Sequence, residues 1–132
     1  MSKFINQIDA RVSKKTIDGK FTRVVILDRA LFYESDLLGN VEVPVGFVSD
    51  GASVPRMLWN LYPPFGEYLE AAVVHDLFCV LGHKGESPID FKMAAKVFKE
   101  AMAVCGVSRW KRQKMYLAVR WCGPKFSAKK AS

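Results

Sequence analysis

The sequence predicts an α+β domain, in which N-terminal hairpins form a small antiparallel β-sheet and three helices follow. Before residue 50, branched and aromatic residues occur in short runs bounded by turn residues, as is typical of strands. After Pro55, apolar residues recur at helical spacing up to residue 123. Because no linker or internal repeat interrupts the chain, we expect one domain over residues 1–124 and a basic tail over residues 125–132.

Two hairpins are predicted in the first third. The Asp-Gly pair at 18–19 precedes the strand-like run 21–27 and can form a two-residue turn, because glycine tolerates the positive φ that such turns need. The Leu-Gly-Asn sequence at 38–40 lies between runs 31–36 and 41–48. We therefore expect a second hairpin there.

The first two helices are predicted from their end signals. Residues 65–81 form the first helix, with Gly82 as its C-terminal cap. Ser87 is placed as the N-cap of the second helix, with Pro88 at the first position and Asp90 completing a capping box. We interpret Asp90 as a helix-start residue rather than a catalytic one.

The third helix is predicted between Ser108 and Gly123, and it combines an apolar stripe with cations. Trp110, Leu117 and Trp121 share one face, and basic residues occupy the flanks. Basic residues interleaved with aromatic ones suit a phosphate backbone, an anionic membrane surface or another acidic partner. The candidate binding residues are Arg109, Lys111, Arg112, Lys114 and Arg120. In the alternative, both tryptophans face the core and the cations are only solvated.

The positive charge is concentrated at one end. The chain has 132 residues and a formal net charge of +7, from twenty basic and thirteen acidic residues. Eight basic residues and no acidic one follow Glu100, so the part up to that residue carries twelve against thirteen, or −1. Charge alone carries no base-sequence information, so nucleic acid is a candidate partner without sequence specificity.

Composition excludes several classes. No apolar run has the roughly 18 residues that a membrane span needs, and the start lacks the apolar stretch of a signal peptide, so a cytoplasmic protein is expected. The odd cysteine count predicts reduced, mostly buried thiols rather than a disulfide framework. Two histidines cannot form a three-histidine zinc site. The cysteines are Cys79, Cys105 and Cys122, and the histidines are His75 and His83.

The segment Ala71 to Leu81 is apolar on nearly every face, which predicts burial of His75 and Asp76. A buried imidazole or carboxylate needs a hydrogen bond, an ion pair or a metal. One interpretation makes His75, Asp76 and Asp50 ligands of a single divalent metal ion that activates water. In the other, His75 bonds a backbone carbonyl or tyrosine hydroxyl, and Asp76 caps the loop 49–53.

The loop before the first helix is the other polar concentration. Residues 46–55 read Gly-Phe-Val-Ser-Asp-Gly-Ala-Ser-Val-Pro. Asp50 and Gly51 predict a tight turn, and Ser53 is placed to cap a helix beginning near Pro55. Ser53 is also a candidate catalytic residue, either as a nucleophile with His75 as its base or as a group that orients substrate. A capping role for Ser53 does not explain why polar residues also stand at Ser49 and Asp50.

Several motifs in this order carry a resemblance to a family. They are the segment 46–55, Trp59 with Pro63-Pro64, Ala-Ala-Val-Val-His-Asp at 71–76, Phe98 with Ala101-Met102, and Met115-Tyr116 with Ala118-Val119-Arg120. Together they resemble a family of small bacteriophage and prophage proteins classed as a domain of unknown function. The resemblance covers about residues 41–123 and implies a viral or prophage origin.

The resemblance also implies that four polar residues lie together, namely Asp50, Ser53, His75 and Asp76. The family pattern has an Asp one turn before Phe98, preceded by an Arg, where this chain has Ala95 and Phe91. If that Asp supplies a ligand or base, this chain has lost it.

Two functions follow as hypotheses. The first is a phage-encoded, metal-assisted hydrolase that uses Asp50, His75 and Asp76, with Ser53 orienting substrate. The second is a non-enzymatic protein, either a virion or tail-assembly component or a host-takeover factor. It would bind a phage structural protein, a host protein or another acidic partner through the basic third helix. Either protein would work in the host cytoplasm or in the virion.

Overall fold

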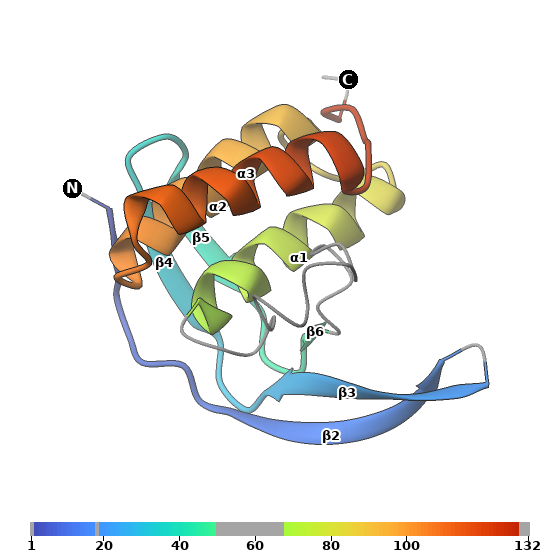
Figure 1. Ribbon diagram of the computed structural model, residues 1–132. Helices are drawn as coiled ribbons and strands as arrows, with labels where there is room; N and C mark the ends of the chain where they lie inside the picture. The colour runs from blue at the N-terminus through green and yellow to red at the C-terminus, as the bar shows by residue number, and fades with distance from the viewer. Residues whose placement is uncertain (1, 18, 50–67, 130–132) are drawn as a thin grey trace.

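The computed structural model describes residues 2–17, 19–49 and 68–129, and within them it has the predicted α+β architecture (Figure 1). Strands occupy the N-terminal part and three helices follow. The strands form two three-stranded antiparallel sheets rather than the single sheet expected. The first sheet, in the order β1-β4-β5, contains Lys3–Phe4, Leu31–Ser35 and Gly39–Val43. The second, in the order β2-β3-β6, contains Ala10–Ile17, Lys20–Leu27 and Val48–Ser49.

Both predicted hairpins are confirmed, but the second strand of the second hairpin ends at Val43 rather than at residue 48. Ile17 of β2 pairs with Lys20 of β3, and Gly19 in the intervening turn has φ +77°. Ser35 of β4 pairs with Gly39 of β5, which has φ +82°. Side chains rarely tolerate such φ values, so glycine sets the turn at both places. Figure 1 shows the β2–β3 hairpin reaching away from the helices.

The three helices are α1 (Leu69–His83), α2 (Phe91–Val104) and α3 (Arg109–Cys122). They lie side by side, with β4 and β5 next to α1 and α2 (Figure 1). The helix α2 is central, because it packs on α1, on α3 and on β4, whereas α3 packs chiefly on α2. One face of α3 is therefore covered by α2, and its opposite face has no neighbouring helix or strand within the described part of the chain.

Three helix ends differ from the prediction, and the first is the start of α1, which lies at Leu69 rather than at residue 65. The helix α1 continues through Gly82 to His83, so Gly82 is an interior residue rather than a cap. A side chain there would collide with the ring of Phe126, so this glycine makes room for the folded-back tail. The N-cap of α2 is Asp90, whose side chain accepts a hydrogen bond from the Met93 amide (2.9 Å), and Ser87 instead closes a small turn with Ile89.

The core lies where α1 and α2 meet the first sheet. Figure 1 shows β4 and β5 behind these helices, and the fully buried side chains there include Leu31 and Val43 from the sheet with Val73 and Phe98 from the helices. The tail packs back on this body, since the Phe91 amide donates to the Phe126 carbonyl at 3.0 Å. No helix among the described residues is both long and apolar enough to cross a bilayer.

Candidate functional site

The polar segment and the buried helix meet at one hydrogen bond. Ser49, the last residue of β6, donates its hydroxyl proton to the Asp76 carboxylate on α1. Both side chains are buried, and Asp76 is only 4% exposed. Burial of Asp76 is therefore confirmed, and β6 is tied to α1 by a charge-assisted bond of the kind that a buried carboxylate needs. Ser49 belongs to the loop 49–53 that the structural interpretation of the sequence assigned to Asp76.

His75 faces a different neighbour. It is 3% exposed, and its ring lies 5.0 Å from the ring of Phe98 on α2, measured between centroids. Its Nδ1 is 3.8 Å from the Sγ of Cys79, one helical turn further along α1. Burial lowers the pKa of His75 from 6.5 to about 4. The imidazole is therefore neutral at pH 7, the form in which it can bind a metal or accept a proton.

The Cys79 thiol stays protonated at neutral pH. Burial, and to a smaller extent the charge of Asp76, raises its pKa to about 12. A thiol in this state is a poor nucleophile and a weak hydrogen-bonding group. All three cysteines are free, as expected, but Cys122 is exposed rather than buried. Its helix turns this position outward, so the expectation of burial is wrong for that residue.

Only part of the proposed polar cluster lies within the described residues. His75 and Asp76 are there, whereas Asp50 and Ser53 fall outside them. Because adjacent helical residues project about 100° apart, His75 contacts α2 while Asp76 contacts β6. Within the described ranges, no group of three His, Cys, Asp or Glu side chains is arranged to hold a metal ion. Asp76 is thus hydrogen-bonded inside the fold, whereas His75 packs against an aromatic ring and a thiol.

The cationic helix has the opposite character, because its apolar stripe faces outward. Trp110 is 57% exposed, Leu117 43% and Trp121 67%, whereas Met115 and Val119 form the buried face of α3. The alternative in which both tryptophans face the core is therefore wrong. Burial of Met115 and Val119 against α2 turns the predicted stripe toward solvent.

Several of the candidate cations border this stripe. The Lys114 ammonium lies 4.6 Å from the ring centroid of Trp110, and the Arg120 guanidinium lies 5.0 Å from that of Trp121. Such cation–π contacts at exposed sites are individually weak, but they keep the charges beside the rings. Arg112 also has a structural role, because it donates to the Val107 carbonyl at 3.0 Å and so holds the turn before α3. Arg109 is exposed and Lys111 partly exposed.

A second polar cluster was not identified from the sequence. The hydroxyls of Tyr33 and Ser35 on β4 both donate to Glu100 on α2, each at 2.6 Å. Burial, followed by the hydrogen bond to Glu100, raises the pKa of Tyr33 above its usual range. These residues are 65 or more positions apart in the sequence, so no local pattern could have indicated the contact. The cluster fastens the first sheet to α2.

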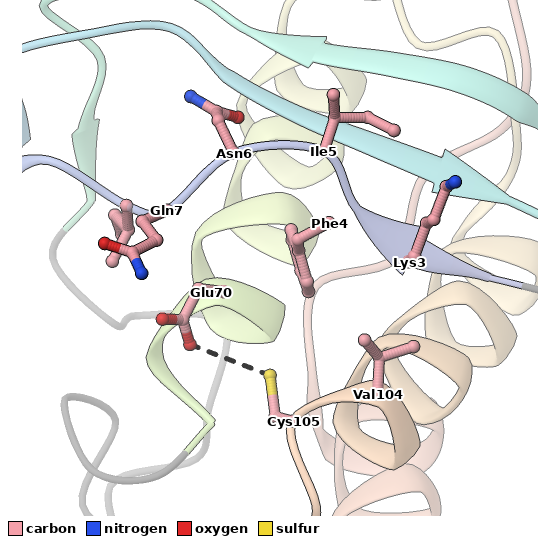
Figure 2. A pocket seen from close by; sticks show the side chains of 9 residues that line it. Lys3, Phe4, Ile5, Asn6, Gln7, Glu70, Val104 and Cys105 are labelled. Carbon is pink, nitrogen blue, oxygen red and sulfur yellow. Dashed lines mark hydrogen bonds between the residues drawn. The ribbon is translucent and has the colours of Figure 1, made fainter.

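One open cavity of about 740 Å³ is lined by described residues (Figure 2). It lies between the N-terminal segment 3–8 and the start of α1, and Figure 2 shows Glu70 and Cys105 facing each other on one side of it. The Cys105 thiol donates to the Glu70 carboxylate at a sulfur–oxygen distance of 3.7 Å. None of the predicted site residues lines this cavity.

Comparison with known proteins identifies relatives but no activity. A protein described as "Uncharacterized protein y4jT", from Sinorhizobium fredii (strain NBRC 101917 / NGR234), is 40% identical over 84 residues, which is 62% of this chain. The match covers only 24% of that protein, so this chain corresponds to about a quarter of its relative. No solved structure matches the chain.

The family model described as "Protein of unknown function (DUF1353)" matches residues 25–119. This range contains the polar segment 46–55, all of α1 and α2, and α3 as far as Val119. It covers well over half of the 132 residues. The chain therefore belongs to the DUF1353 family of proteins of unknown function.

Proposed function

We propose that this protein is a non-enzymatic binding protein that docks an anionic partner through α3. The observation that carries the proposal is the outward line of Trp110, Leu117 and Trp121. Large apolar side chains that are exposed together mark interaction sites, and tryptophan and arginine are the residues that most often dominate binding energy at interfaces. Because the charged side chains beside the line are cationic, the partner is expected to be anionic.

The charge distribution supports an anionic partner. No acidic side chain follows Glu100, whereas eight basic side chains do. On the phage or prophage origin that the sequence resemblance implies, the partner would be a virion, tail-assembly or host component, met in the host cytoplasm or in the virion. Attraction between exposed charges weakens with ionic strength, so binding should fall steeply as salt is added.

The test uses three defined anionic probes, namely fluorescent polyglutamate, a single-stranded oligonucleotide and vesicles containing phosphatidylglycerol. Binding of at least one probe should weaken with salt and with Arg109→Glu/Lys114→Glu. The matched control is Lys92→Glu/Lys96→Glu, which makes the same charge change on the exposed side of α2. Failure of all three probes to bind, or equal loss in the control, contradicts docking through α3.

The second candidate function is the metal-assisted hydrolase, and the neutral state of His75 next to Asp76 favours it. The donor types fit a divalent ion, since an imidazole nitrogen and a carboxylate oxygen are ordinary ligands, and Ser49 brings the polar segment to Asp76. In this proposal Asp50 is the third ligand and Ser53 orients substrate. The metal would polarise a substrate oxygen or activate water.

Untagged protein should then contain bound metal, and its melting temperature should rise on addition of manganese, magnesium or zinc. His75→Asn should abolish that rise, whereas His83→Asn, at the exposed end of α1, should not. Untagged protein that contains no metal and melts at the same temperature with and without each ion would exclude this candidate.

A further inference from the structure

One exposed line of α3 is apolar, although a helix on the surface of a soluble domain normally turns its polar side outward. Taking about 100° per residue, Leu117 and Trp121 each lie within about 20° of Trp110 around the helix axis. The buried residues Met115 and Val119 lie on the opposite side. The line therefore points away from α2, and the 11 residue steps from Trp110 to Trp121 correspond to a length of about 16 Å.

Cations lie on both sides of this line. By the same spacing, Lys111 and Lys114 fall on one side of it and Arg109 and Arg120 on the other. The helix thus presents an apolar ridge between two basic borders. Lys114 and Arg120 are already held against the tryptophan rings, so their charges stay close to the ridge.

The shape of the surface favours a flat partner. Helix α3 lies on the outside of the helical layer (Figure 1), so the apolar line is a convex ridge. The cavity near Glu70 and a smaller one beside Tyr33 are lined by no residue of α3. A ridge offers no groove that could follow a nucleic-acid backbone or enclose an extended acidic peptide.

The chemistry of the ridge fits the interface of a bilayer. Tryptophan is favoured at the depth of the lipid head groups, because its ring is apolar and its N–H can remain hydrogen-bonded. A helix that lies in this plane buries Trp and Leu and keeps Lys and Arg at the level of the phosphates. Cationic borders on both sides of the ridge would meet anionic head groups.

We propose that α3 docks this protein on an anionic lipid surface, with Trp110, Leu117 and Trp121 inserted at head-group depth and the flanking cations on lipid phosphates. This inference rests on the proposed function and names its partner. It requires no membrane-spanning segment, because only one face of one helix enters the interface.

The test measures binding to vesicles of phosphatidylcholine alone and of phosphatidylcholine mixed with phosphatidylglycerol. The protein should sediment with the mixed vesicles only, and its tryptophan emission should shift to shorter wavelength. Lipids brominated near the head group should quench that emission. Trp110→Ala/Trp121→Ala should weaken binding at least about tenfold, as expected when two interfacial tryptophans are lost. Trp110→Phe/Trp121→Phe should retain most of the binding.

A matched control removes exposed apolar side chains elsewhere. Val12→Ser/Val45→Ser lies outside the helices, and both positions are exposed, so vesicle binding should not change. Circular dichroism and the melting temperature check that every variant is folded. Because the substituted α3 residues are exposed, the fold should survive their replacement.

Each other outcome overturns the inference in a distinct way. If polyglutamate or the oligonucleotide binds through the same residues and the mixed vesicles do not, the proposed function stands and the lipid surface is wrong. If no probe binds, both fail. If vesicles bind equally well after the tryptophan and charge substitutions, α3 is not the docking surface. If the ridge instead joins two copies, Trp121→Ala converts a dimer to a monomer without affecting vesicles.

Discussion

Helices α1 and α3 depart in opposite ways from the usual pattern of buried apolar and exposed polar side chains. In α1 an imidazole and a carboxylate are buried in an otherwise apolar helix, whereas α3 exposes two tryptophans and a leucine. The polar groups of α1 have contacts within the fold, because Ser49 bonds Asp76, and Phe98 and Cys79 lie against His75. The apolar ridge of α3 is covered by no described helix or strand. Packing therefore explains much of α1, whereas the exposed apolar line of α3 is what the proposed partner would cover.

The largest loss of stability is expected when a buried side chain that packs against α1 is removed. Phe98 is fully buried and lies against the rings of His75 and Tyr68. Phe98→Ala should lower the free energy of unfolding by about 3 to 5 kcal/mol, the usual cost of the cavity left by a phenylalanine. Urea denaturation measures it. A loss below about 1 kcal/mol would show that this region is not tightly packed.

The next largest effect should come from the bond between β6 and α1. Ser49→Ala leaves the buried Asp76 carboxylate without that donor, and such losses cost about 1 to 3 kcal/mol. Tyr33→Phe is the matched control, because it removes one hydroxyl donor from Glu100, which retains the Ser35 donor. We expect the control to cost less. Equal losses would show that Asp76 depends no more on Ser49 than Glu100 does on Tyr33.

His75 should make stability depend on pH. Its folded pKa of about 4 lies below the ordinary 6.5, so the unfolded chain binds the additional proton between these values. The stabilisation is present above pH 6.5 and is lost as the pH falls toward 4. From that shift, acidification to about pH 5 should cost about 2 kcal/mol. His75→Gln should flatten this part of the stability curve, whereas His83→Gln should leave it unchanged.

The smallest effect on stability is expected on α3. Trp121→Ala removes a side chain that is largely in solvent, so the free energy of unfolding should change by no more than about 0.5 kcal/mol. The same substitution should affect binding strongly. A loss of several kcal/mol would mean that the ridge is packed within the protein, and the contrast between the two helices would disappear.

Much of the fold could be predicted from local pattern. The two hairpins follow from glycines that occupy positive φ, and the helices follow from apolar spacing, which are interactions between near neighbours in the chain. The separation into two sheets could not be predicted, because β6 pairs with β3 across more than twenty residues. The contacts of Tyr33 and Ser35 with Glu100 are equally remote. For the candidate site, burial of His75 and Asp76 was predictable, and so was the loop 49–53 as a partner of Asp76. The packing of His75 on Phe98 was not predictable, because Phe98 lies on another helix.

The sequence by itself determined which residues share a helix face and where the positive charge lies, because both depend only on spacing and composition. It could not decide which face of α3 meets the core, because Met115 with Val119 and Trp110 with Trp121 are both apolar pairs at helical spacing. Packing on α2 made that choice. The tertiary structure buries the smaller pair and leaves the tryptophan ridge, with its cations, at the surface.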